Sequence, residues 1–306
     1  MKNADLGVDL ASLRLANPTM LASGILGYSV ETLANIAKAG AGAVVTKSVS
    51  QKPRGGYANP TVVQADCGLI NALGLPNPGI KEFAKEIRRA KAITSVPLVV
   101  SVFGFSDEEY ASVARKAVDA GADGVELNVS CPHVKKTGSE IGQDPKILTQ
   151  VVRRVKASVD KPVFVKLSPN VTSMSDVACA AVRAGADALT VMNTVKAMAI
   201  NVETEMPVLA NRVGGLSGAA VKPIALRNVY EVYEEVDVPI VGCGGITDWR
   251  DAVEFLLAGA SAVQIGTAIA NEGLGVFTAI TRGIHACLRK KGLRSVSEIV
   301  GLSHSN

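Results

Sequence analysis

The chain has 306 residues, of which 48% are hydrophobic and 20% are charged, so it can bury a large core and is not an intrinsically disordered segment. Its 32 basic and 28 acidic residues give a net charge of +4 without a long block of like charge, which argues against a nucleic-acid-binding surface. Basic runs such as Arg289-Lys290-Lys291 are typical of solvated helix faces.

The first residues of the chain lack the apolar core of a signal peptide, and the later apolar stretches are interrupted by glycine and polar residues. The five cysteines have neither paired spacing nor a C-x-x-C motif, so we expect no disulfide, zinc or iron–sulfur site and no other bound metal. Together these features predict a soluble protein of the reducing cytoplasm, with no membrane segment.

Eight segments have the pattern of strands buried on both faces. In chain order they cover residues 18–23, 44–47, 97–104, 125–128, 162–168, 188–191, 239–242 and 262–265. Four of them follow an Ala-Gly-Ala unit, in which glycine suits the left-handed end of a helix and alanine allows the helix to pack closely on a sheet. A repeated helix-then-strand unit implies parallel strands joined by helical crossovers.

Eight such strands predict a (β/α)8 TIM barrel, with residues 1–306 forming one domain. An open doubly wound sheet is the alternative, but no G-x-G-x-x-G motif follows the first strand and no domain boundary is visible. The acidic residues Asp107-Glu108-Glu109 and Asp248 are expected at helix N-termini. Two inserts, residues 49–77 and 195–218, follow strands on their C-terminal side and are expected to lie as loops over the barrel mouth.

Polar or glycine residues end the predicted strands, and the C-terminal ends of barrel strands share one mouth, where barrel enzymes place their chemistry. They are Ser23, Lys47, Ser48, Ser101, Asn128, Cys131, Lys166, Asn193, Thr194, Gly244, Gly245, Gly266 and Thr267. A lysine at a strand end can also extend into solvent. Two lysines that end strands in the same mouth are nevertheless better explained by a shared site.

The segment Asn128-Val129-Ser130-Cys131-Pro132 follows one of these strands. Because proline cannot continue a strand ladder, Cys131 is expected in a loop from which its thiol could reach a substrate. The alternative is that Cys131 is a small buried hydrophobic residue, as most lone cysteines are.

The glycines of residues 242–245 and the pair Gly266-Thr267 follow the seventh and eighth strands. They offer backbone N–H groups beside a helix start, which is how barrels bind phosphate, although glycine also serves plain turns. If the phosphate belongs to flavin mononucleotide (FMN), Lys166 would face the electron-rich edge of the ring and stabilise negative charge there as a hydride arrives.

Three asparagines, Asn71, Asn128 and Asn193, could pair with the N–H and C=O groups of a planar ring such as a pyrimidine. Lys47 could then neutralise a carboxylate or polarise a carbonyl. Taken singly, an asparagine more often caps a turn.

Over nearly its whole length the chain resembles the dihydroorotate dehydrogenases, in particular the soluble class that uses a cysteine base. The matching motifs are residues 17–24, 46–48, 71–77, 128–132, 165–170, 214–218 and 244–246. The resemblance implies that FMN is held by Ser23, Lys47, Ser48, Asn128, Lys166, Met192, Gly218, Gly244, Gly245, Gly266 and Thr267. It implies that dihydroorotate contacts Lys47, Asn71, Ala72, Leu73, Gly74, Leu75, Asn128, Asn193 and Thr194.

In this resemblance Cys131 would be the base that removes the C5 proton of dihydroorotate while a hydride passes from C6 to flavin N5. A free thiol titrates near ~8.5, so this role needs a locally favoured thiolate or proton transfer concerted with hydride loss. A cysteine here also argues against the membrane-bound, quinone-using class, in which serine is the base.

Residues 71–79 resemble the NAD-linked subclass more than the fumarate-using one. That subclass pairs with a second subunit that carries FAD and an iron–sulfur cluster, and because this chain lacks cluster ligands we expect such a partner, together with a homodimeric core. One departure is His133, where the family usually has asparagine. With residues 142–145, His133 resembles the dihydropyrimidine dehydrogenases, which act on uracil and thymine, although it can also be an ordinary loop histidine. Dihydroorotate remains the expected substrate because residues 71–77 and 214–218 match the dihydroorotate enzymes.

Two functions of other classes remain open. A flavin-free phosphate-binding barrel, a lyase or isomerase, could form a Schiff base at Lys166 or Lys47. A noncatalytic barrel could act only as a scaffold.

Overall fold

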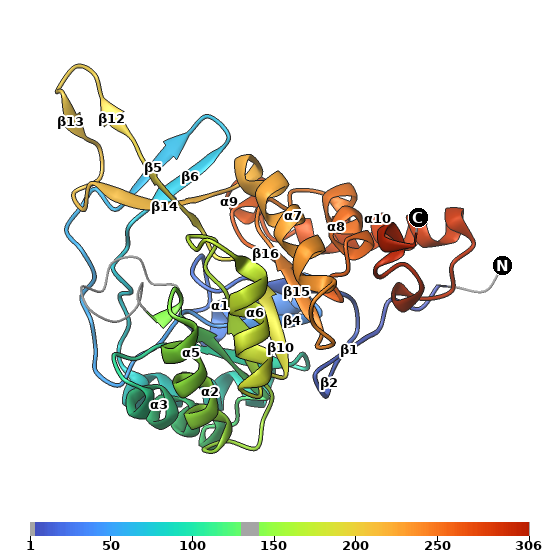
Figure 1. The fold of residues 1–306 in the computed structure, drawn as a ribbon, viewed down its shortest axis with the longest axis horizontal. Coiled ribbons are helices and arrows are strands. Elements are labelled where there is room, and N and C mark those ends of the chain that lie inside the picture. Colours follow the sequence, from blue (N-terminus) through green and yellow to red (C-terminus); the bar gives the residue numbers. More distant parts are fainter. Residues whose placement is uncertain (1–3, 130–140, 306) are drawn as a thin grey trace.

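The computed structural model describes residues 4–129 and 141–305, so Cys131 and His133 lie outside the described residues. Within them, eight parallel strands close into a barrel in the order β10-β15-β16-β3-β4-β7-β8-β9 (Figure 1). The strands are β3 (Thr19–Leu21), β4 (Ala43–Val45), β7 (Leu98–Val102), β8 (Gly124–Asn128), β9 (Val163–Lys166), β10 (Ala188–Val191), β15 (Ile240–Cys243) and β16 (Ala262–Ile265). The predicted TIM barrel is confirmed, because each strand lies within or overlaps its expected segment.

Helices surround the barrel (Figure 1). They are α1 (Val30–Lys38), α2 (Ile80–Ile93), α3 (Asp107–Asp119), α5 (Pro145–Lys156), α6 (Met174–Arg183), α7 (Lys222–Tyr233), α8 (Trp249–Leu257), α9 (Ala268–Glu272) and α10 (Val276–Lys291), with short 3-10 turns η1 (Ala219–Val221), η2 (Val296–Glu298) and η3 (Leu302–His304). Asp107 opens α3, and Asp248 caps α8 by accepting hydrogen bonds from Arg250 and Asp251, as expected for acidic groups at helix N-termini. The glycines of the four Ala-Gly-Ala units follow α1, α3, α6 and α8 with φ between 98° and 111°, so they end their helices as predicted.

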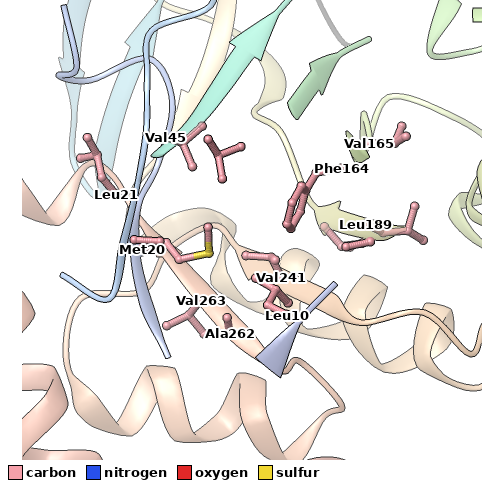
Figure 2. Close-up of a cluster of buried hydrophobic side chains, with 14 of the residues drawn as sticks. Leu10, Met20, Leu21, Val45, Phe164, Val165, Leu189, Val241, Ala262 and Val263 are labelled. Atoms are coloured by element: carbon pink, nitrogen blue, oxygen red, sulfur yellow. The ribbon is translucent and has the colours of Figure 1, made fainter. Parts of the chain in front are cut away.

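An antiparallel N-terminal hairpin, β1 (Val8–Leu10) with β2 (Leu13–Leu15), packs at the N-terminal end of the barrel strands. Leu10 and Leu15 are fully buried. Figure 2 shows Leu10 among side chains of the barrel strands, including Val241 and Val263. Apolar packing therefore fills this end of the barrel and leaves the opposite, C-terminal end for a cavity.

The two inserts do more than form loops. They pair with each other in a four-stranded sheet of order β11-β14-β6-β5, built from β5 (Val62–Ala65), β6 (Gly68–Asn71), β11 (Val195–Met198) and β14 (Val213–Ser217). The antiparallel β6–β14 pair sets Asn71 opposite Gly215. Figure 1 shows this sheet, and a further hairpin of β12 (Ile200–Asn201) and β13 (Met206–Pro207), standing out from the barrel at the upper left.

Candidate active site

A cavity of about 470 Å³ lies between the C-terminal ends of the barrel strands and the insert sheet. The strand ends contribute polar side chains and glycines, and the sheet contributes Leu69, Asn71 and the 215–218 segment. The volume is within the range of small-molecule and cofactor sites.

The cavity brings together nearly all the residues that the sequence singles out. Those lining it are Ser23, Lys47, Ser48, Asn71, Leu73, Gly74, Leu75, Asn128, Lys166, Met192, Asn193, Thr194, Gly218, Gly244, Gly245, Gly266 and Thr267. Ala72 does not line it, because it is buried beside Ile70 and Leu209 in a separate small core. Cys131, the expected base, lies outside the described residues, after the strand that ends at Asn128.

One cation of the cavity comes from the end of β4. Lys47 is buried, its Nζ donates to the carbonyl oxygen of Gly24 at 3.1 Å, and it lies 5.0 Å from the centroid of the Tyr28 ring. An ammonium group held over an aromatic face is stabilised by the negative face of the ring. The Lys47 charge is therefore fixed at the cavity wall.

The second cation belongs to a buried polar chain that the sequence reading missed. Lys166 Nζ donates to Gln264 Oε1 at 2.8 Å, and Gln264 Nε2 donates to Glu126 Oε2 at 2.6 Å. Burial disfavours the charge on Lys166, but the Cys243 sulfur and the Glu126 carboxylate outweigh it, so the pKa of Lys166 lies above its ordinary value. Burial raises the pKa of the Cys243 thiol. Near neutral pH the cavity therefore holds an ammonium and a neutral thiol side by side.

Two of the three amide side chains, Asn128 and Asn193, are joined in one network with Ser48. Asn128 Nδ2 donates to Ser48 Oγ at 3.0 Å, and Asn193 Nδ2 donates to Asn128 Oδ1 at 3.3 Å. Asn71 reaches the cavity from the insert sheet, where its Nδ2 donates to the carbonyl oxygen of Gly215 at 3.3 Å. These side chains present donors and acceptors that suit a ring with alternating N–H and C=O groups.

The glycine-rich turn after β15 is held rigidly from behind. Asp251 Oδ2 accepts the N–H and the hydroxyl of Thr247 at 2.8 and 2.6 Å, while Asp251 Oδ1 accepts from Lys222 Nζ at 2.7 Å. Burial would raise the pKa of Asp251, but the hydrogen bonds from Lys222 and Thr247 lower it below its ordinary value. The turn that carries Gly244 and Gly245 is thereby fixed between α7 and α8.

The described part of the chain has neither a membrane-spanning helix nor a metal-binding group of side chains. None of its helices is long and apolar enough to cross a membrane. Across residues 4–129 and 141–305, the acidic, cysteine and histidine side chains form no group that could hold a metal ion.

A closed (β/α)8 barrel whose C-terminal mouth gathers two buried lysines, an amide network and glycine-rich turns defines a barrel enzyme with a nucleotide-sized cavity. The family model described as dihydroorotate dehydrogenase matches residues 5–288. The chain is 50% identical over 298 residues to the "Dihydroorotate dehydrogenase B (NAD(+)), catalytic subunit" of Pyrococcus abyssi, covering 97% of this chain and 99% of that protein. It is 49% identical over 301 residues to the protein of the same name in Methanothermobacter thermautotrophicus, covering 98% of each.

The chain therefore belongs to the dihydroorotate dehydrogenase family, a family of flavin-dependent oxidoreductases, and the resemblance seen in its motifs is confirmed.

Proposed function

We propose that the protein is the catalytic subunit of an NAD-linked dihydroorotate dehydrogenase, which oxidises dihydroorotate to orotate in pyrimidine biosynthesis with FMN as its flavin. The observation that carries this proposal is the cavity itself, which is lined by the amide side chains and by both lysines. The names of the relatives, half identical over nearly their full lengths, support the same activity.

The described residues fit FMN. The cavity has apolar walls for a ring and glycine turns for a phosphate, and a Cβ at Gly24, which lines it, would meet no protein atom within 4 Å. When bound, FMN would supply a flavin ring that accepts a hydride. The residues proposed to hold it are Ser23, Lys47, Ser48, Asn128, Lys166, Met192, Gly218, Gly244, Gly245, Gly266 and Thr267.

The other groups of the cavity are proposed to bind dihydroorotate. The Lys47 ammonium would pair with the substrate carboxylate, which is a charge-assisted hydrogen bond. Asn71, Asn128 and Asn193 would bind the N–H and C=O edges of the ring, with Leu73, Gly74, Leu75 and Thr194 around it. Ala72 is proposed to support this segment from behind, because its side chain is buried in the insert core.

Cys131 is proposed as the base that takes the C5 proton. It follows β8 by three residues beyond Asn128, and the end of β8 lines the cavity. The thiolate form is the competent one, so this role depends on the local stabilisation of negative charge or on a concerted transfer.

We further propose a partner subunit, since the relatives are named as catalytic subunits. A subunit with FAD and an iron–sulfur cluster would carry electrons from the flavin to NAD. The exposed apolar side chains of the β12–β13 hairpin, including Ile200 and Met206, offer a surface for subunit contact, and a homodimeric core is proposed. A cytoplasmic location is proposed because the five cysteines have no paired spacing.

The test is anaerobic reduction of the purified flavoprotein by dihydroorotate, dihydrouracil and dihydrothymine in separate experiments. We expect dihydroorotate alone to bleach the visible flavin absorbance. The Cys131→Ser variant should keep the flavin and bleach far more slowly, whereas Cys67→Ser, which changes an exposed cysteine outside the cavity, should behave as the wild type.

Three results would contradict the proposal. Protein that neither carries a flavin nor takes up FMN would favour a lyase, isomerase or scaffold. Bleaching by dihydrouracil alone would favour a dihydropyrimidine dehydrogenase. Equal bleaching rates for Cys131→Ser and wild type would exclude Cys131 as the base.

A further inference from the structure

A carboxylate lies inside the barrel, beneath the cavity. Glu126 is in the middle of β8 and is fully buried, and it does not line the cavity. Barrel interiors are normally filled by branched aliphatic side chains, and an ionised carboxylate there costs several kcal/mol unless it is well paired. A charge at this position is therefore stable only if hydrogen bonds or an opposite charge compensate its desolvation.

The contacts of Glu126 lead to the cavity. Its Oε2 accepts from Gln264 Nε2 at 2.6 Å and from Thr190 Oγ1 at 3.0 Å, as expected for an ionised carboxylate. Gln264 turns its other end toward Lys166 Nζ, 2.8 Å away. A carboxylate, an amide and an ammonium thus form one hydrogen-bonded chain from the barrel interior to the cavity wall.

The strands explain why these side chains meet. Glu126, Thr190 and Gln264 come from β8, β10 and β16, which are alternate strands in the barrel order. Alternate strands contribute side chains to the same interior layer of a barrel. In this chain that layer is polar. It lies next to Lys166, the cavity lysine that is proposed to face the flavin.

The charged and titratable groups that face Lys166 from the described strands are Glu126 on β8 and Cys243 on β15. Lys47, which follows the end of β4, adds a second positive charge to the same cavity. Burial raises the pKa of the Cys243 thiol, so the thiol does not supply the counter-charge. Glu126 Oε2 only accepts hydrogen bonds, from Gln264 and Thr190, and this geometry assigns the counter-charge to the Glu126 carboxylate. Oε1 of Glu126 has no hydrogen-bond partner among the described residues, so Oε2 carries the two contacts that orient the carboxylate.

We propose that Glu126 is a positioning residue that acts through Gln264: it is the buried counter-charge that fixes the place and the charge of the Lys166 ammonium beside the flavin. This inference rests on the proposed function of the cavity. The carboxylate does not touch flavin or substrate. Its effect is that Lys166 remains a cation, able to stabilise negative charge on the flavin ring over a wide pH range.

The test uses sulfite as a probe of the positive charge at the ring. The sulfur lone pair of sulfite forms a bond to flavin N5, and the π electron pair displaced from the C=N bond at N5 moves onto the ring as negative charge. The dissociation constant of sulfite is measured by flavin absorbance from about pH 6 to about pH 10, below the ordinary lysine pKa. We expect no titration of Lys166 in wild-type protein. In Glu126→Gln we expect a break in the plot of the dissociation constant against pH, at the pH where Lys166 loses its proton. Above this break sulfite binding should be about ten- to hundredfold weaker, since one full charge is lost near the ring.

Thr190→Val is the matched control, because it removes one hydrogen bond to the same carboxylate but keeps both charges. It should follow the wild-type curve, and the double variant Glu126→Gln/Lys166→Met should lack the break. Superimposable curves for Glu126→Gln and wild type would overturn the proposal. If Glu126→Gln does not fold, Gln264→Met carries the test: it removes the bridge and should weaken sulfite binding, and unchanged binding would overturn the proposal.

These outcomes are separate from those for the proposed function. A protein without a flavin contradicts the function. A flavoprotein with unaltered sulfite curves contradicts only the role of Glu126.

Discussion

Gly245 offers a direct test of whether the turn after β15 binds the flavin phosphate. It has φ of +75°, and a Cβ there would lie 2.6 Å from the backbone nitrogen of Lys222, the first residue of α7. Lys222 cannot retreat easily, since Asp251 holds its side chain at 2.7 Å. For Gly245→Ala, the left-handed conformation costs about 1–2 kcal/mol and the backbone overlap about 1–3 kcal/mol, so the free energy of unfolding should fall by about 2–5 kcal/mol.

The matched control is Gly292→Ala, which has nearly the same φ, +74°, but no protein atom within 4 Å of the added Cβ. Its loss should be only about 1–2 kcal/mol, the cost of the backbone conformation alone. Urea unfolding of both variants and fluorescence titration with FMN measure the two effects. We expect FMN affinity to fall at least about tenfold in Gly245→Ala and to be unchanged in Gly292→Ala. Equal destabilisation, or full FMN affinity in Gly245→Ala, would refute this reasoning.

Three further substitutions test other parts of the site. Lys47→Met keeps most of the length of the side chain but removes its charge, so kcat/KM for dihydroorotate in steady-state assays should fall by about 10- to 150-fold, the value of a charge-assisted hydrogen bond of about 1.5–3 kcal/mol; an unchanged value would exclude the carboxylate contact. Asp251 has a pKa below its ordinary value, so its ionised form stabilises the fold above about pH 4 and this contribution is lost as the pH falls through the folded-state pKa. Asp251→Asn should therefore cost about 2 kcal/mol at neutral pH and lose less stability on acidification than the wild type, as measured by urea unfolding at several pH values; parallel pH curves would show that another group is responsible. Tyr110→Phe removes the 2.9 Å hydrogen bond from the buried hydroxyl to the carbonyl oxygen of Asn128 and should cost about 1 kcal/mol in thermal unfolding, whereas no loss would mean that this bond adds nothing to the anchoring of β8.

The barrel could be predicted from the sequence because its signals are local. Each strand is a short apolar run, and each Ala-Gly-Ala unit marks the end of a helix within the same few residues. The cavity residues followed from the same reasoning, since all parallel strands of a barrel end in one mouth.

The insert sheet could not be predicted in this way. Its central pair joins Asn71 to Gly215, 144 residues apart, and no periodicity within either segment reports such a pairing. The position of Ala72 follows from the extended backbone. Side chains alternate along it, so Leu69, Asn71 and Leu73 face the cavity while Ile70 and Ala72 pack beside Leu209.

Glu126 was missed for a different reason, and a signal for it was present. The run Gly124-Val125-Glu126-Leu127-Asn128 has the pattern of a strand buried on both faces, in which a charged residue cannot reach solvent. A glutamate in the middle of such a strand must find a partner inside the barrel. The partner itself was beyond prediction, because Gln264 lies 138 residues further along the chain.

Close approach explains why the segment 214–218 is rich in glycine. Gly215 does not have a positive φ, so backbone freedom is not what this position requires. A Cβ at Gly215 would instead collide with the side chain of Thr194, and a Cβ at Gly218 would lie 2.6 Å from the Cα of Gly68. The glycines therefore let the 214–218 segment approach both the start of β6 and the loop that follows β10, so that the insert sheet and the barrel mouth line one cavity. Any side chain at Gly215 would displace Thr194 from the cavity wall, and so the identity of this residue shapes the proposed substrate site.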